Sequence, residues 1–188
     1  MKARINLSLL AAAGVLIAGC KTEPQMTNRP DFLSTYDHLQ KVDNTTYRYV
    51  SKPLLANCNK FTLSPVKVMF NDFAGKDLTD EDKRRSGEFV EQTVRGAVAS
   101  RYAVVTDKGP DVAEIRMAIT SAYGTGGKLG LCLQGEVIDS SSTQVGAVVK
   151  TEISEYYSPH WEDKDSAKEM VKAWGQRLVA AIDEAHGK

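Results

Sequence analysis

The chain has 188 residues, of which 24 are Lys or Arg, 24 are Asp or Glu, and 42% are hydrophobic. This length suits one domain with additional segments, and the ordinary composition excludes wholesale disorder. The balanced charge argues against a basic nucleic-acid-binding protein, so we expect no nucleic-acid partner. No run of residues is long and apolar enough for a permanent transmembrane helix.

The N-terminus has the parts of an export signal. Two basic residues lie in the first four positions, and an uncharged run follows from Leu7 to Gly19. This run is shorter than the roughly 20 apolar residues of a membrane-spanning helix. A charged start, a short apolar core and small residues at its end are typical of a secretory signal. We expect residues 1–19 to be a lipoprotein signal peptide rather than a buried N-terminal helix, because Cys20-Lys21 ends the run at once.

The end of this run, Ile17-Ala18-Gly19-Cys20, resembles the lipobox of bacterial lipoproteins. The resemblance implies cleavage before Cys20, lipidation of its thiol and acylation, such as by palmitate, of the new amino terminus. Each buried methylene adds roughly 0.8 kcal/mol of membrane affinity, so two or three acyl chains hold a protein stably. Lys21 stands where Asp is the usual signal for the inner membrane. We therefore expect a lipid anchor in the outer membrane and a domain at its periplasmic face.

The segment after the cysteine is predicted to connect the lipid to a domain. Residues 21–31 are polar, contain two prolines and lack an apolar period, which is typical of a flexible tether. Residues 44–49 are rich in Thr and Tyr and are expected to be extended. Between them, four apolar or aromatic residues share one side of two predicted helical turns that should dock on the domain: Phe32, Leu33, Tyr36 and Leu39. Residues 20–59 are thus predicted to be a lipidated tether and docking segment.

A globular domain is predicted over residues 60–188, beginning with a strand over 61–70. Thr79, followed by three acidic residues, is typical of a helix start, because acids are favoured near a helix N-terminus. Apolar residues then recur at helical spacing to about Arg101. A short buried strand is predicted over residues 102–106.

Three longer strands alternate between apolar and other residues, over 113–120, 129–137 and 145–154, which is typical of an antiparallel meander. A turn at residues 139–143 connects the last two strands. The resulting hairpin sets four pairs opposite each other: Ile138 and Gln144, Val137 and Val145, Gly135 and Ala147, and Leu133 and Val149. The apolar faces of the two strands coincide in this register.

The last predicted element is a helix over residues 167–185, whose apolar residues recur at positions i, i+3, i+4 and i+7. This helix should lie across the apolar face of the sheet and leave the other face of the meander polar and partly open. The predicted fold is a single α/β (α+β) domain of two layers. It combines a mixed sheet of about five strands, including the three-strand antiparallel meander, with two long helices packed mainly on one face.

Cys58 and Cys132 remain after lipidation of Cys20. Beyond the inner membrane the environment is oxidising, so this even pair is a candidate disulfide. Such a bridge closes a long loop and contributes roughly 4 kcal/mol in the chain-entropy model. The alternative is two separate buried thiols that act as small apolar residues. Since Cys132 shares the polar face of the sheet, the bridge would draw the N-terminal segment across that face.

The sequence contains no evident catalytic or metal-binding motif. Its three histidines, His38, His160 and His186, lack the spacing of a zinc site, and no GxSxG nucleophile elbow is present. Residues 124–128 look like a phosphate loop, but a strand rather than a helix follows them, which favours a hairpin connection. We expect no catalytic residue, no metal and no cofactor, and hence no enzyme. A hydrolase is the least favoured alternative, kept because a spatial triad is invisible in sequence.

An aromatic segment between the last strand and the last helix is a candidate binding loop. It contains Tyr156, Tyr157, His160 and Trp161. If exposed, these side chains would offer a contact surface for an envelope protein or a glycan. The alternative, which we favour, is that they cap the end of the core. The mixed charges of the open sheet face are typical of a solvated surface.

Five short motifs resemble those of a known family: Phe32-Leu33-Ser34 with Tyr36 and Leu39, Arg48-Tyr49-Val50, Ser64-Pro65-Val66, residues 135–139 running into Thr143, and Ala173-Trp174. On these motifs the mature chain resembles a bacterial lipoprotein family catalogued as domain of unknown function 3313. The chain departs from the family's Thr-Gly at Thr143-Gln144, in the predicted turn. The resemblance implies an envelope lipoprotein and supplies no catalytic residues.

The sequence therefore predicts an envelope lipoprotein, anchored at Cys20 and facing the periplasm, with a non-enzymatic binding or scaffold role. The membrane is contacted through the covalent lipid, and the expected further partner is an envelope protein or a glycan. The first alternative is a lipoprotein that binds a small ligand or a glycan through the aromatic loop or the polar sheet face.

Overall fold

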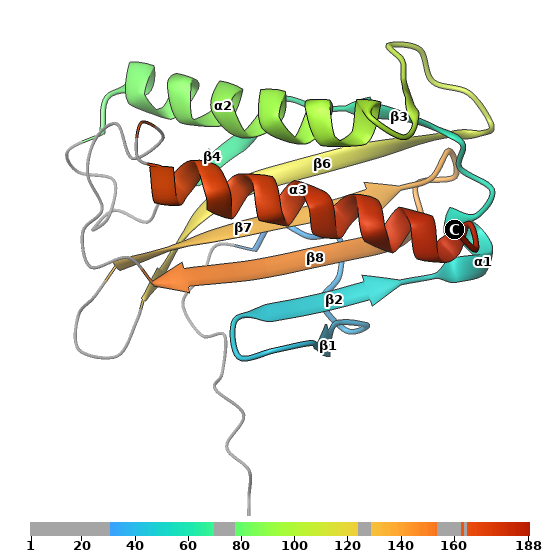
Figure 1. Ribbon diagram of the computed structural model, residues 1–188, viewed down its shortest axis with the longest axis horizontal. Helices are drawn as coiled ribbons and strands as arrows, with labels where there is room; N and C mark the ends of the chain where they lie inside the picture. Colours follow the sequence, from blue (N-terminus) through green and yellow to red (C-terminus); the bar gives the residue numbers. More distant parts are fainter. Residues whose placement is uncertain (1–30, 70–77, 124–128, 154–162, 164) are drawn as a thin grey trace, which may run out of the picture.

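The computed structural model describes residues 31–69, 78–123, 129–153, 163 and 165–188. In this part of the chain, one mixed sheet carries two long helices side by side on one of its faces (Figure 1). The sheet has eight strands in the order β1-β2-β8-β7-β6-β3-β5, with β4 pairing on β6. The predicted class of fold is confirmed, and the sheet is wider than the predicted five strands.

The strands are β1 (Gln40–Lys41), β2 (Thr46–Val50), β3 (Lys60–Leu63), β4 (Lys67–Met69), β5 (Ala103–Val104), β6 (Val112–Tyr123), β7 (Leu129–Ile138) and β8 (Gln144–Ile153). The helices are α1 (Lys52–Leu55), α2 (Asp80–Ala99) and α3 (Asp165–Ala185). Strands β6, β7 and β8 form the predicted antiparallel meander. The antiparallel strand β2 extends it beside β8, and β3 and β4 extend it in parallel beside β6.

The strand predicted over residues 61–70 is in fact two short strands. β3 ends at Leu63 and β4 begins at Lys67, and Pro65 lies between them. Proline has no N–H to donate and is tolerated in sheets only at edges, strand starts and irregularities. Leu63 pairs with Ile115 and Lys67 pairs with Ala118, so both pieces still lie along β6.

Helix α2 begins where the sequence predicted it, at a capping box. The Thr79 hydroxyl accepts a hydrogen bond from Asp82 N at 3.1 Å, and Asp82 Oδ2 accepts one from Thr79 N at 2.9 Å. The two residues thereby satisfy N–H groups that have no partner within the helix. Three acidic residues in the first turn complement the helix dipole.

The register of the β7–β8 hairpin differs from the prediction after its first pair. Ile138 lies opposite Gln144 as predicted, but Val137 pairs with Gly146, Gly135 with Val148 and Leu133 with Lys150. Val145 is thus an extra residue on β8, which is a β-bulge. A shift of one residue moves every following side chain to the other face of the sheet. Ala147 and Val149 consequently lie on the face opposite the long helices.

The main core lies between the sheet and the helices α2 and α3. Trp174 of α3 is 1% exposed within this cluster, which also contains Ile115, Leu133 and Val148. The Trp174 ring lies over Gly135 of β7, where an added Cβ would be 2.5 Å from the ring carbons Cζ2 and Cη2. The absence of a side chain at this position of β7 therefore allows α3 to approach the sheet closely.

The N-terminal segment covers part of the other face of the sheet, and we call this other face the second face. Residues 32–39, named the strap here, pack against a second cluster formed by Leu33, Cys132, Ala147 and Val149. The strap consists of bends and a turn instead of the predicted helical turns. Residues 40–59, which the sequence assigned to the docking segment, form β1, β2 and α1 of the same sheet and core.

Candidate functional site

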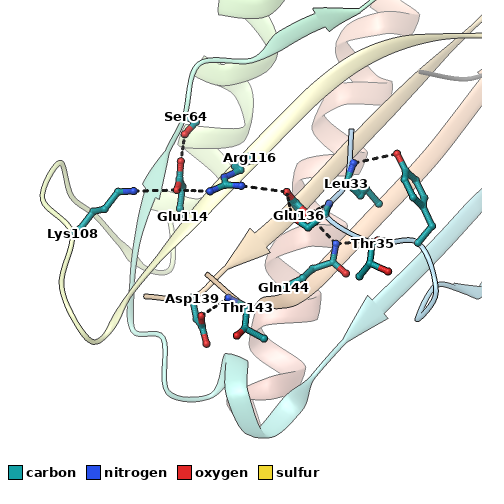
Figure 2. A network of polar contacts seen from close by, with 12 residues as sticks. Leu33, Thr35, Ser64, Lys108, Glu114, Arg116, Glu136, Asp139, Thr143 and Gln144 are labelled. Atoms are coloured by element: carbon teal, nitrogen blue, oxygen red, sulfur yellow. Dashed lines mark hydrogen bonds and ion pairs between the residues drawn. The ribbon is translucent and has the colours of Figure 1, made fainter. Parts of the chain in front are cut away.

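The strap is held on the second face by the carboxylate of Glu136, a residue of β7 that is 2% exposed. Glu136 accepts hydrogen bonds from Ser34 N at 2.8 Å, from Ser34 Oγ at 3.1 Å and from Gln144 Nε2 at 2.9 Å. The same Gln144 nitrogen donates to Thr35 O at 3.2 Å (Figure 2). The strap is therefore attached to the sheet through its backbone as well as through its side chains.

Tyr36 forms a second attachment within the strap. Its hydroxyl accepts hydrogen bonds from Phe32 N at 2.8 Å and Leu33 N at 3.1 Å, and donates one to Gln134 Oε1 at 2.6 Å. Gln134 is completely buried and donates to Thr120 Oγ1 at 3.1 Å. The polar sheet face that the sequence predicted to be open and solvated is thus covered here. The strap shields it from water and satisfies its polar groups.

The polar contacts continue from Glu136 to the molecular surface as a row of alternating charges (Figure 2). Arg116 of β6 lies 3.8 Å from Glu136 and 3.3 Å from Glu114, and Lys108 lies 3.4 Å from Glu114 on its other side. The Ser64 hydroxyl donates a hydrogen bond to Glu114. This bond, supported by Arg116 and Lys108, lowers the pKa of Glu114 despite its partial burial.

A cleft of about 310 Å³ lies at the outer end of this row. Its lining includes Thr62 of β3, Glu114 and Arg116 of β6, and Lys108 and Asp139 from adjoining loops. Thr62 pairs with Glu114 in the parallel register, so the two side chains lie on the same face of the sheet. The Thr62 hydroxyl is buried and has no hydrogen-bond partner among the described residues. Such an atom requires a partner such as water or a ligand. We therefore take this cleft as the candidate functional site.

The turn that borders the cleft is organised by Asp139. Its Oδ1 atom accepts hydrogen bonds from Ser141 N at 2.9 Å, Ser141 Oγ at 2.7 Å and Thr143 N at 2.8 Å. Burial acts to raise the pKa of Asp139, but these bonds outweigh it and lower the pKa. Ser142 has a φ of 66°, a conformation that only a minority of residues other than glycine adopt. The Asp139 side chain thus stabilises the turn that the sequence predicted at residues 139–143.

The two cysteines that the sequence suggested as a disulfide lie in different clusters. Cys58 belongs to the main core beside the helices, whereas Cys132 belongs to the cluster under the strap. No disulfide joins them, because the sheet separates the two clusters. The alternative of two separate buried thiols describes this arrangement. Burial raises the pKa of the Cys58 thiol, which disfavours its reactive thiolate form.

The other predicted site residues lie outside the described part of the chain. They are the lipidation residue Cys20 and the aromatic loop residues Tyr156, Tyr157, His160 and Trp161. Of the remaining histidines, His38 packs on Tyr49 with ring centroids 5.0 Å apart, and His186 Nε2 lies 3.1 Å from Cys58 O. Among the described residues, no three His, Cys, Asp or Glu side chains form a metal-binding group. None of the helices described combines the length and the apolarity needed to cross a membrane.

A family described as "Protein of unknown function (DUF3313)" matches residues 29–131. The match covers more than half of the chain and runs from the strap into β7. The chain belongs to this family. The DUF3313 match includes Ser34, Thr62, Lys108, Glu114 and Arg116, whereas Glu136 and Gln144 lie beyond it. No curated protein matches the chain.

Two solved structures are distantly similar to this DUF3313 protein. A PelC dodecamer from Paraburkholderia phytofirmans matches with a TM-score of 0.43 and 15% sequence identity, over 73% of this chain and 95% of that chain. A PDZ domain protein from Parabacteroides distasonis matches with a TM-score of 0.40 and 11% identity, over 68% of this chain. The chain spans only 32% of the length of that second protein. Both are similarities of backbone fold, and neither indicates a function for this chain.

Proposed function

We propose that this DUF3313 protein is an envelope lipoprotein, anchored by lipid at Cys20 to the periplasmic face of the outer membrane, with a non-enzymatic binding or scaffold role. The observation that carries the proposal is the strap. The chain that follows the predicted tether is attached to the sheet by Ser34 and Tyr36, whose partners Glu136 and Gln134 are buried. A force exerted through the lipid anchor would therefore be transmitted to a folded part of the domain.

The length of the predicted tether supports this role. Residues 21–30 separate the lipidation residue from the described chain. Ten residues span at most roughly 35 Å when fully extended. A domain that is attached from Phe32 onward would stay within this distance of the membrane surface. A long flexible linker would allow a much wider range of distances between the domain and the membrane. The strap therefore favours a module that works close to the bilayer.

The lipid anchor is tested by the mass of the N-terminal peptide from the full chain, expressed in a two-membrane bacterium and recovered from its outer-membrane fraction. The expected peptide begins at Cys20 and carries the added lipid. Cys20→Ser should lack the lipid and retain residues 1–19, since the processing that we propose requires the modified thiol. Cys58→Ser is the matched control and should be lipidated like the wild type. A wild-type peptide with an unmodified Cys20 would contradict the anchor.

The binding role is tested separately, by crosslinking the wild-type chain in intact cells and purifying it with its crosslinked partners. We expect one envelope protein or envelope polymer to be recovered repeatedly with the wild type. Cys20→Ser should recover less of it, because the anchor concentrates the module at the membrane. Repeated recovery of neither a protein nor a polymer would count against a scaffold role.

A second candidate function is a lipoprotein that binds a small ligand. The buried Thr62 hydroxyl, which lacks a partner among the residues described, favours it, because ligand sites combine a concave shape with a few polar groups that fix the ligand.

A further inference from the structure

Both carboxylates of the cleft already accept hydrogen bonds from neighbouring groups. Glu114 accepts from the Ser64 hydroxyl, from Lys108 at 3.4 Å and from Arg116 at 3.3 Å. Asp139 accepts three bonds within its own turn. A ligand that approached Glu114 with hydrogen-bond donors would meet oxygens that already accept bonds from Ser64, Lys108 and Arg116. The Glu114 carboxylate therefore serves contacts within the protein, as Asp139 Oδ1 does.

The donors of the cleft, in contrast, have capacity to spare. The Arg116 guanidinium has five N–H groups, and its contacts with Glu114 and Glu136 leave part of the side chain, 38% of it, exposed. The Lys108 ammonium has three N–H groups, and its side chain is 83% exposed. The Thr62 hydroxyl, which is buried in the same cleft, has no hydrogen-bond partner in the part of the chain that the structure describes. The donors with unmet capacity in the cleft are thus one neutral and two cationic groups.

We propose that this cleft binds a small anionic ligand, whose carboxylate or phosphate oxygens accept hydrogen bonds from Thr62, Arg116 and Lys108. Anionic oxygens pair well with guanidinium and ammonium groups, and a planar guanidinium can bind two of them at once. The hydroxyl of Thr62 would add a neutral donor to the site, since that atom is buried and Thr62 lines the same cleft as the two charged groups. This inference rests on the second candidate function, a lipoprotein that binds a small ligand, and names the class of that ligand.

The same geometry predicts that binding is weak. Glu114 and Asp139 line the cleft beside the two cations, so the formal charges of these four side chains cancel. An anion gains little from the net field of such a site and depends on short-range hydrogen bonds. We therefore expect affinities in the millimolar range and a strong dependence on the Thr62 hydroxyl.

The test is a titration of the full-length protein in non-ionic detergent, at neutral pH and constant ionic strength. Sodium acetate, sodium phosphate and, as the reference salt, sodium chloride are the probes, and two-dimensional amide NMR spectra are the measurement. We expect saturable shifts at residues around the cleft with acetate, phosphate or both, and none with chloride. Saturation with acetate alone identifies a carboxylate ligand, and saturation with phosphate alone identifies a phosphate ligand.

Thr62→Val removes the hydroxyl with little change in shape, and we expect it to weaken binding by at least tenfold. Arg116→Lys keeps the charge but loses the planar fork, and it should also weaken binding. Arg84→Gln is the matched control: this arginine pairs with Glu81 and Glu88 on α2, on the other face of the sheet, so binding should not change. Absence of saturation with both probes, or equal binding by Thr62→Val, overturns the inference. If the titration fails but the chain is lipidated and still recovers its crosslinked partner, the inference about the cleft is overturned and the proposed function stands.

Discussion

At the scale of single residues, Glu136 holds the strap on the second face. Its carboxylate accepts three hydrogen bonds, from Ser34 N, Ser34 Oγ and Gln144 Nε2. Arg116 adds a more distant ionic contact at 3.8 Å. A buried carboxylate without such partners would be very unfavourable, so the strap and Glu136 depend on each other.

We predict that Glu136→Gln lowers the free energy of unfolding by about 1–3 kcal/mol. The new amide group would place N–H donors against the donors of Ser34 and Gln144, leaving buried groups unpaired. Amide hydrogen exchange of residues 32–39 should become faster at the same time. Ser34→Ala is the milder control: it removes one hydroxyl bond and keeps the bond from Ser34 N, at a cost of about 0.5–1.5 kcal/mol. Unchanged exchange in Glu136→Gln would show that this carboxylate does not hold the strap.

At the scale of elements, the contact between α3 and β7 depends on Gly135. Trp174 is 1% exposed and occupies the space where a side chain at position 135 would lie. The bulge at Val145 has a complementary effect in the neighbouring strand. It keeps Val145 on the side of the helices and moves Ala147 and Val149 to the side of the strap. One strand thus contributes apolar residues to two clusters.

We predict that Gly135→Ala lowers the free energy of unfolding by about 1–3 kcal/mol, because overpacking forces α3 or β7 to shift. The added Cβ would lie 2.5 Å from two carbons of the Trp174 ring. Gly96→Ala is the matched control, since no atom lies within 4 Å of a Cβ added there on α2. Replacing this helical glycine should raise the stability by about 1 kcal/mol. Thermal and urea unfolding of the two variants measure these opposite effects, and equal stabilities would contradict the packing described here.

At the scale of the whole molecule, the strap adds a partial third layer to the predicted two. The long helices cover one face of the sheet, and residues 32–39 cover part of the other. Ion pairs connect distant segments around these layers. Glu184 of α3, for example, lies 2.9 Å from Lys52 Nζ and 3.2 Å from Arg48 Nη2. The bond from Lys52 lowers the pKa of Glu184, as the bond from Ser64 lowers that of Glu114.

We predict that acid destabilises the protein through carboxylates of this kind. Because their pKa values are lower in the folded than in the unfolded chain, their contribution is complete above the unfolded pKa and is lost as the pH falls through the folded pKa. Unfolded Asp and Glu titrate at about pH 4, so the thermal midpoint should change little between neutral pH and about pH 5. At pH values below about 4 the thermal midpoint should decrease. Glu114→Gln should show a smaller fall than the wild type. An equal fall in both would mean that Glu114 does not contribute.

Much of the fold could be predicted because it follows from local patterns. Period-two alternation in the meander, the Thr79 capping box and the apolar face of α3 depend on residues within a few positions of each other. The candidate site could be predicted only in part. The alternation predicted a polar second face of the meander, on which Glu114, Arg116, Gln134 and Glu136 lie. No local pattern placed Ser34, Thr62 or Gln144 beside that face.

The sequence by itself determined the class of fold, both long helices, the meander and the motif at Cys20 from which lipidation is expected. Only the tertiary structure decided that the strap covers part of the polar face, that Ala147 and Val149 lie beneath the strap, and that the Thr62 hydroxyl lies in a cleft without a partner among the described residues. The physical reason is distance along the chain. Ser34 and Glu136 are 102 positions apart, and a single extra residue at Val145 reverses the faces of a strand. Local periodicity in the sequence reveals neither the contact between Ser34 and Glu136 nor the bulge at Val145.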